Sequence, residues 1–148
     1  MKLSKKTEYY ENGHLKETYF SDENNRKQGL YRKYWPNGRL WIKCTYQDGK
    51  LNGRYQSYYR NGQLLSECNY TNGKEDGTYL SYWENNRLWT RCNYKDGCED
   101  GLYEVYYRNG QLLEKCVYKM GLKLYTLKKQ RHNKMVKKEI CLNQKTRA

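Results

Sequence analysis

The sequence repeats itself every 24 residues, and this period restricts the chain to a stack of similar supersecondary units. Units of one pattern begin at Gly29, Gly53, Gly77 and Gly101. They share the pattern G-x-Y-x-x-Y-[WY]-x-N-[GN]-x-L-x-x-x-C-x-Y-x-x-G. We therefore predict a repeat strip at 1–127, with a degenerate repeat at 7–28 and full repeats at 29–52, 53–76, 77–100 and 101–124.

Each repeat is typical of a β-hairpin, because an Asn-Gly pair lies between two aromatic runs. We expect two-residue type I′ turns, with positive φ at both residues, at Asn37-Gly38, Asn61-Gly62, Asn85-Asn86 and Asn109-Gly110. A second turn, such as Gln47-Asp48-Gly49-Lys50, links each hairpin to the next. The fold class predicted is all-β: an elongated, single-layer antiparallel meander of nine or ten strands, with a partial edge strand at Leu124–Leu127.

The pairing register follows from the position of the Asn-Gly turn. It predicts Trp35–Leu40, Lys33–Ile42 and Tyr31–Cys44 in the first full repeat, and Tyr59–Leu64, Ser57–Ser66 and Tyr55–Cys68 in the second. Since side chains alternate along a strand, the other face carries Tyr34–Trp41, Tyr58–Leu65, Tyr82–Trp89 and Tyr106–Leu113. Both faces therefore carry a row of aromatic residues.

Composition alone would indicate a disordered chain. Leu, Ile, Val and Phe make up only about 15% of the 148 residues, and the net charge is +13. However, 18 Tyr and 4 Trp accompany a single Pro, so aromatic rings supply the apolar area. No apolar run is long enough to span a membrane, and the N-terminus does not resemble a secretory signal. We expect a reducing, cytoplasmic location.

The recurring cysteines are predicted to be structural. Equivalent positions of successive hairpins lie two strands apart, about 9–10 Å at ~4.8 Å per strand. This spacing excludes both a disulfide and a tetrahedral zinc site in the row Cys44, Cys68, Cys92 and Cys116. We expect these side chains to pack under the paired tyrosines. Cys98 and Cys141 are the thiols expected to be exposed, with an intermolecular bridge through either as an alternative.

Catalytic chemistry finds little support in the sequence. His14 and His132 are the only histidines, and neither has a nucleophile and an orienting carboxylate around it. The recurring Asp residues occupy turn positions, where Asp is expected for backbone reasons. We expect a protein that is not an enzyme and that has no cofactor and no metal site.

An aromatic row is the candidate protein-binding surface, because a single-layer sheet leaves one row of rings partly in water. Its predicted residues are Tyr34, Trp41, Tyr58, Tyr82, Trp89 and Tyr106, with Trp41 and Trp89 as the expected hot spots. All four Trp lie in alternate repeats, and Tyr58–Leu65 recurs unchanged as Tyr106–Leu113. Duplication of a two-repeat unit explains this 48-residue offset; selection for Trp at a ligand site is the alternative.

The positive charge is concentrated at the end of the sequence. Residues 122–148 hold +8, and the preceding 121 residues hold +5. The segment 128–148 is predicted to be a basic tail or a short helix that caps the sheet edge. It is also the candidate site for nucleic acid or an anionic membrane, or else a solubilising segment. Its predicted contacts are Lys128, Lys129, Arg131, Lys134, Lys137 and Lys138.

The repeat resembles the MORN repeat over residues 7–125, in the variant form with N-G-x-L at the turn. It is similar to bacterial antitoxin-like repeat proteins and most similar to the repeat families of large DNA viruses of amoebae, which share L-x-x-x-C-x-Y as in Leu64 to Tyr70. The resemblance implies a twisted β-strip that binds proteins or, in some members, lipid head groups. It implies no catalytic role.

These observations favour a non-enzymatic scaffold or adaptor that binds another protein along its aromatic face. If the viral likeness holds, the role would be host interaction or virion association, in the host cytoplasm or the virion. One alternative is an antitoxin-like neutralising protein, and another is an electrostatic binder of nucleic acid or anionic lipid. A homo-oligomer is compatible with the open sheet edges.

Overall fold

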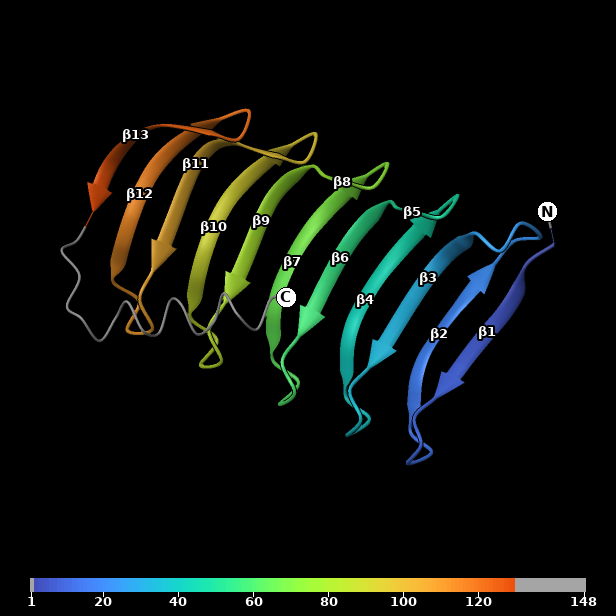
Figure 1. The fold of residues 1–148 in the computed structure, drawn as a ribbon. Helices are drawn as coiled ribbons and strands as arrows, with labels where there is room; N and C mark the ends of the chain where they lie inside the picture. Colours follow the sequence, from blue (N-terminus) through green and yellow to red (C-terminus); the bar gives the residue numbers. More distant parts are fainter. Residues whose placement is uncertain (1, 130–148) are drawn as a thin grey trace.

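The computed structural model describes residues 2–129, which form one open antiparallel sheet of thirteen strands without a helix (Figure 1). This confirms the all-β meander, since eleven strands follow one another across the sheet in chain order. β5 and β8 are two-residue strands that pair with β4 and β7. The strands are β1 (Ser4–Tyr9), β2 (Leu15–Ser21), β3 (Lys27–Tyr34), β4 (Leu40–Gln47), β5 (Lys50–Leu51), β6 (Gly53–Tyr58), β7 (Leu64–Thr71), β8 (Lys74–Glu75), β9 (Gly77–Tyr82), β10 (Leu88–Lys95), β11 (Cys98–Tyr106), β12 (Leu112–Lys119) and β13 (Leu122–Lys129).

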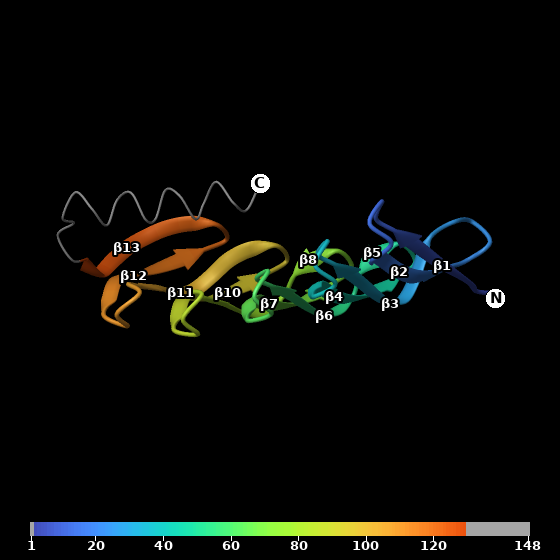
Figure 2. The ribbon, with the colours of Figure 1, turned by 90° about the horizontal axis from the view of Figure 1, so that it is seen from below.

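The sheet is a single layer. Figure 1 shows the strands side by side along one direction, and Figure 2 shows that the strands of residues 2–129 form no second layer. The strands are curved, with the loops β1–β2, β3–β4, β6–β7, β9–β10 and β11–β12 at one long edge and the turns that connect successive hairpins at the other. Each strand therefore buries its side chains mainly against its neighbours in the same sheet.

The turn within each hairpin, such as that at Asn37-Gly38, differs from the prediction. Gly38 has φ 80°, but Asn37 does not have positive φ. The N–H of Gly38 donates to the carbonyl of Trp35, and the N–H of Trp35 donates to the carbonyl of Arg39, both at 2.8 Å. The loop is thus three residues long, a type I turn closed by one left-handed residue. The predicted type I′ turn at this edge is wrong.

Type I′ geometry occurs instead at the opposite edge. Asp48 has φ 51° and Gly49 has φ 77°, and the flanking residues Gln47 and Lys50 pair directly. Positive φ at both central residues defines this turn. The same pair of positive angles recurs at Asn72-Gly73, Asp96-Gly97 and Met120-Gly121.

The three-residue loop changes the register beside it. The predicted pairs Lys33–Ile42 and Tyr31–Cys44 are confirmed, as are Ser57–Ser66 and Tyr55–Cys68. Nearer the turn, a β-bulge lets Tyr34 pair with Leu40 and leaves Trp41 as the extra residue. The bulge recurs in the other repeats, where Leu64, Leu88 and Leu112 face Tyr58, Tyr82 and Tyr106. The pairs wrongly predicted are Trp35–Leu40, Tyr59–Leu64, Tyr34–Trp41, Tyr58–Leu65, Tyr82–Trp89 and Tyr106–Leu113.

A ladder of tyrosines and cysteines forms the core. Cys44, Cys68, Cys92 and Cys116 are each at most 5% exposed and lie directly opposite a tyrosine of the same repeat. A second tyrosine of each repeat contacts the first, with ring centroids between 5.3 and 5.9 Å apart. The predicted packing of the cysteines beside paired tyrosines is therefore confirmed.

The two ends of the strip deviate from the regular repeat. At the C-terminal end, β13 is longer than predicted, and Lys128 and Lys129 are strand residues opposite Lys115 and Glu114. The rest of the predicted tail, including the capping-helix alternative, lies outside the described residues. At the N-terminal end, a three-residue loop with Asn25 at φ 58° joins β2 to β3.

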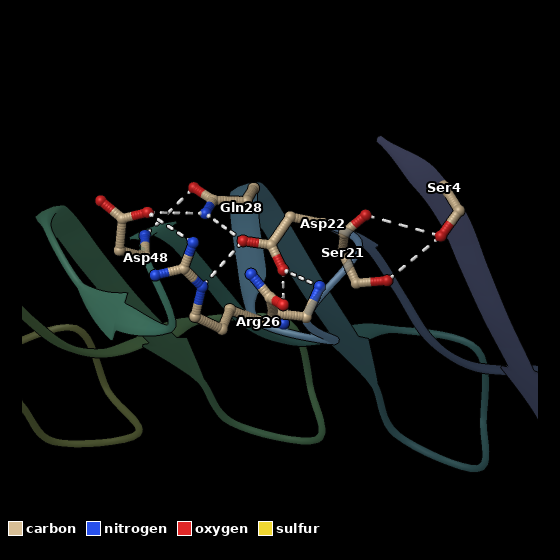
Figure 3. Close-up of polar contacts among 7 residues, drawn as sticks. Ser4, Ser21, Asp22, Arg26, Gln28 and Asp48 are labelled. Atoms are coloured by element: carbon tan, nitrogen blue, oxygen red, sulfur yellow. Dashed lines mark hydrogen bonds and ion pairs between the residues drawn. The ribbon is translucent and has the colours of Figure 1, made fainter. Parts of the chain in front are cut away.

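A buried carboxylate organises this first loop (Figure 3). Asp22 is 4% exposed and accepts hydrogen bonds from the N–H groups of Asn24 and Arg26, the Arg26 guanidinium and the Gln28 amide. Gln28 also exchanges two hydrogen bonds with Asp48 in the next turn. Burial alone would raise the pKa of Asp22, but these hydrogen bonds outweigh it and hold the pKa below its usual value. The network ties the first loop to the first connecting turn.

The left-handed residue of each three-residue loop can be tested directly. Gly62 has φ 93°, and an added Cβ would meet only the Arg39 side chain, at 3.9 Å. We expect Gly62→Ala to lower the free energy of unfolding by roughly 1–2 kcal/mol, because an L-residue is strained in this conformation. Asn86, at φ 62° in the third repeat, is the matched site, and Asn86→Gly should stabilise by about 0.5 kcal/mol. Urea unfolding measures both changes in the free energy of unfolding. Equal effects of the two substitutions would contradict the left-handed conformation of this loop position.

Candidate interaction surface

The sheet has two faces of different chemistry. Residues directly opposite each other in neighbouring strands point to the same face, and successive residues of a strand alternate. We name the face of Tyr31 and Cys44, with their equivalents in the other repeats, the Tyr–Cys face. The opposite face, which we name the Tyr–Leu face, carries Tyr34, Tyr58, Tyr82 and Tyr106 opposite Leu40, Leu64, Leu88 and Leu112.

The structure separates the tryptophans from the tyrosines of the predicted binding surface. Trp41 stacks on Trp35 with centroids 4.0 Å apart, and the Lys33 ammonium lies 4.6 Å from the Trp41 ring centroid. Lys33 belongs to the Tyr–Cys face, because it follows Tyr31 by two residues on β3, and Trp35, one residue past the end of this strand, continues the same alternation. Trp89 likewise pairs with Trp83, with centroids 4.7 Å apart and ring planes tilted by 30°. The prediction that the Trp and Tyr residues share one face is therefore wrong, because the bulge turns the Trp side chains over.

Polar atoms of the aromatic rings connect one repeat to the next. The Trp35 indole N–H donates to the carbonyl of Tyr58 at 3.1 Å, and the Trp83 indole N–H donates to the carbonyl of Tyr106 at 3.0 Å. At the equivalent position of other repeats a tyrosine hydroxyl makes this bond. The Tyr10 hydroxyl donates to the carbonyl of Tyr34 at 2.7 Å, and the Tyr59 hydroxyl donates to the carbonyl of Tyr82 at 2.8 Å. Sequence reasoning missed this role. The available signal was that this position holds Trp or Tyr but never Phe, which lacks a donor.

The four tyrosines of the Tyr–Leu face form a regular, half-buried row. Each lies opposite a half-buried leucine, so every repeat presents one ring and one aliphatic side chain. Burial is the main cause that raises the pKa of Tyr82 and Tyr106 above the usual tyrosine value. The row is thus partly desolvated but open to a partner.

A row of mostly polar residues, which we name the polar row, runs beside these tyrosines, with one residue for each long strand from β3 to β13. Glu104 is its most buried member, at 5% exposure, and forms ion pairs with Arg91 at 2.6 Å and Lys115 at 2.9 Å. Burial alone would raise the pKa of Glu104, but hydrogen bonds from Lys115, Arg91 and Tyr106 lower it overall. Basic members exceed acidic ones, five to two. The row is Arg32, Lys43, Gln56, Glu67, Leu80, Arg91, Glu104, Lys115 and Lys128.

Burial disfavours the thiolate form of the buried cysteines. Burial raises the pKa of Cys44 and of Cys68 to about 11, well above the ordinary value. Cys98, in contrast, is exposed, as predicted. Cys141 and His132 lie outside the described residues, and His14 contacts the carbonyl of Pro36 through its ring nitrogen, at 2.6 Å.

Residues 2–129 hold no cluster of His, Cys, Asp and Glu side chains that could bind a metal ion. The same residues include no helix with the length and hydrophobicity needed to cross a membrane. Of the predicted tail contacts, Arg131, Lys134, Lys137 and Lys138 fall beyond the described part of the chain. The candidate surface of the described strip is therefore one of its two faces.

Comparison with known families agrees with this architecture. A family model described as the MORN repeat variant matches five tandem segments, residues 5–22, 27–48, 51–72, 75–96 and 99–120. The chain belongs to this family. Each of the last four matches in this MORN protein contains one three-residue loop and ends at the first central residue of a type I′ turn. No curated protein matches the sequence closely enough to be counted as a relative. MORN repeats are generally non-enzymatic modules that bind proteins or membranes, so the family supports an interaction role.

The ring-to-carbonyl hydrogen bonds predict a specific loss of stability. Tyr59→Phe keeps the ring but removes the hydroxyl that donates to the Tyr82 carbonyl. We expect the free energy of unfolding to fall by about 0.5–1.5 kcal/mol in urea titrations. Tyr125→Phe is the control, because Tyr125 is 55% exposed on β13 and should change stability by less than ~0.5 kcal/mol. Equal effects of both substitutions would show that the hydrogen bond does not hold the repeats together.

Thiol reactivity separates the buried and exposed cysteines. In Cys141→Ser protein at pH 8, we expect one fast-reacting thiol per chain towards a disulfide reagent, namely Cys98, because only the thiolate attacks. The thiols whose pKa is about 11 also predict a pH effect: folded protein holds these protons more tightly than unfolded chain. Stability should be full below about pH 9 and fall as the pH rises towards 11. More than one fast-reacting thiol per chain at pH 8 would contradict the burial of the cysteines that lie opposite the tyrosines.

Proposed function

We propose that this MORN protein is a non-enzymatic scaffold or adaptor that binds another protein on its Tyr–Leu face. The observation that carries the proposal is the row Tyr34, Tyr58, Tyr82 and Tyr106, which is half-buried and regularly spaced. Tyrosines of this kind are enriched at the centres of protein interfaces, because they combine a large apolar area with a hydroxyl group. The tryptophans are not included, because they pack in pairs on the other face.

The size of the row suits a standard protein interface. Six strand spacings separate Tyr34 on β3 from Tyr106 on β11, which is about 29 Å at 4.8 Å per spacing. Strands of six to nine residues make this face about 20–30 Å wide. The resulting area is on the order of 600–850 Å², close to the ~800 Å² that each partner commonly contributes.

The charges beside the row indicate the chemistry of the partner. Arg32 and Lys43 are exposed at one end of the polar row, whereas the acidic members Glu67 and Glu104 are already ion-paired. A partner with apolar side chains flanked by carboxylates fits this arrangement, and its association should weaken with rising salt.

The narrower hypotheses differ from one another in the partner. Host interaction or virion association predicts a host or virion protein, and an antitoxin-like role predicts a toxin. Electrostatic binding of nucleic acid or anionic lipid predicts retention that depends on the basic tail. A homo-oligomer predicts a second copy of the chain.

The test is quantitative capture from a lysate of the source organism, with the full chain as bait and mass spectrometry as readout. We expect Tyr58→Ala/Tyr82→Ala to reduce the recovered partner more than tenfold, because two central rings are removed. Tyr9→Ala/Tyr125→Ala is the comparison variant: it removes two rings, 65% and 55% exposed, from the first and last strands of the same face, and should reduce recovery much less than the loss of two central rings.

A second variant keeps the proposal testable if the alanine variant does not fold. Arg32→Glu/Lys43→Glu changes only exposed side chains and should retain the β-type circular dichroism. It should also reduce recovery several-fold, because it reverses the charge facing the partner. Undiminished recovery with both folded variants would reject the Tyr–Leu face as the binding surface.

A further inference from the structure

Every full repeat carries one arginine in the loop that joins its two long strands. These loops lie side by side along one long edge of the sheet, which we name the loop edge (Figure 1). Arg39 and Arg87 follow the Asn-Gly or Asn-Asn pair of their loops, whereas Arg60 and Arg108 precede it. The arginine therefore changes sides from one loop to the next, and all four side chains are exposed.

This alternation brings two arginines together at the junction of the first and second full repeats. The Arg39 guanidinium reaches forward and donates to the carbonyl of Asn61. The Arg60 side chain reaches backward, and its guanidinium carbon lies 5.1 Å from the Trp35 ring centroid. Two positive charges are thus held at one junction, on side chains that reach in opposite directions.

The junction of the third and fourth full repeats has the same arrangement, because the two-repeat unit recurs after 48 residues. The Arg87 guanidinium donates to the carbonyl of Arg108 at 3.4 Å, and the Arg108 guanidinium carbon lies 5.2 Å from the Trp83 ring centroid. The strip therefore carries two equivalent arginine pairs on its loop edge.

The junction between these two, which joins the second and third full repeats, lacks such a pair. Gln63 and Glu84 occupy the corresponding positions. The Tyr59 hydroxyl still donates to the Tyr82 carbonyl there, so a junction holds together without an arginine pair. Along the loop edge, the three junctions therefore carry two positive charges, one negative charge and two positive charges in turn.

Neither arginine pair has an acidic partner within residues 2–129. Arg26, Arg54 and Arg91 each form an ion pair with a carboxylate, whereas no carboxylate of the described residues pairs with an arginine of the loop edge. Two guanidinium groups at one junction repel each other, and a bound anion would relieve this repulsion. The arginine pairs are therefore suited to an anionic partner from outside the described strip.

We propose that the loop edge binds an extended acidic segment of another protein, with one pair of carboxylates at each arginine pair. The N–H groups of a guanidinium match the two oxygens of a carboxylate, so each arginine can take one acidic side chain. Four strand spacings separate the two junctions, about 19 Å at 4.8 Å each. Six residues of extended chain span about 20 Å. Acidic pairs six residues apart therefore reach both junctions and, because side chains alternate, point to the same side.

The gap between the arginine pairs favours such a segment over a nucleic acid. Nucleic acids carry an unbroken series of closely spaced phosphates. The exposed carboxylate of Glu84, between the two pairs, would repel the middle of that series. An acidic segment with an uncharged centre avoids this repulsion. The inference concerns the loop edge and not the Tyr–Leu face, so it does not depend on the proposed function, and the two can fail separately.

The test compares two fluorescent nine-residue peptides of serine and glutamate by their anisotropy when titrated with the full chain. The split peptide has glutamate at its first, third, seventh and ninth positions, and the clustered peptide has four consecutive glutamates at its centre. Both have the same charge, but only the split peptide reaches both arginine pairs. We expect it to bind more than tenfold more tightly at about 150 mM salt, because the second contact is intramolecular.

Substitution of one arginine pair should abolish this preference. Arg39→Gln/Arg60→Gln introduces the residue that Gln63 already provides at an equivalent loop position, so the fold should be retained and circular dichroism checks it. In this variant we expect the split peptide to bind no more tightly than the clustered one. Lys50→Gln/Lys74→Gln is the matched control: it removes two exposed charges from the opposite edge and should change the affinity less than twofold.

A gain of binding tests the same geometry from the other direction. Gln63→Arg/Glu84→Arg places an arginine pair at the middle junction, about 10 Å from each of the others. We expect the clustered peptide to bind this variant several-fold more tightly than the unmodified chain, because its glutamates then reach two adjacent junctions. Equal affinities of the two peptides for the unmodified chain would overturn the proposal. An oligothymidylate that binds more tightly than the split peptide, through the same arginines, would also overturn it and identify a nucleic acid as the ligand.

Discussion

Each hairpin of this strip is joined to the next by an aromatic side chain that also donates a hydrogen bond. A single-layer sheet has no second layer to bury its side chains, so its stability depends on contacts between neighbouring repeats. The indole of Trp35 and the hydroxyl of Tyr59 each reach the backbone of the following repeat. Their rings contribute buried area while their polar atoms satisfy a carbonyl. This double role explains how a chain with few aliphatic residues folds.

The choice of turn at each edge decides what the two faces contain. The three-residue loop adds one residue to the hairpin, and a bulge at Trp41 or its equivalent absorbs it. As a result the Trp pairs gather with the Tyr–Cys ladder, while Tyr34 and its equivalents remain with the leucines. The strip thus has a densely aromatic face and a mixed aromatic and basic face.

Much of the fold could be predicted, because a period of 24 residues and a turn signal in every repeat leave few alternatives. The meander, the pairs Tyr31–Cys44 and Ser57–Ser66, and the exposure of Cys98 are all present in the structure. The candidate site was predicted less well: the four tyrosines share a face, but Trp41 and Trp89 do not join them. The hydrogen-bonding role of Trp35 was also missed, because a repeat pattern shows which residue recurs but not which atom it contacts.

The sequence by itself therefore determined the hairpins, their order and the composition of the core, since these depend on local propensity and on the period. Only the tertiary structure decided which aromatic side chains share a face. The physical reason is that side chains alternate every residue along a strand, so one extra residue at a turn moves a side chain to the other side. That residue is set by whether Asn37 takes positive φ, and Asn tolerates both conformations.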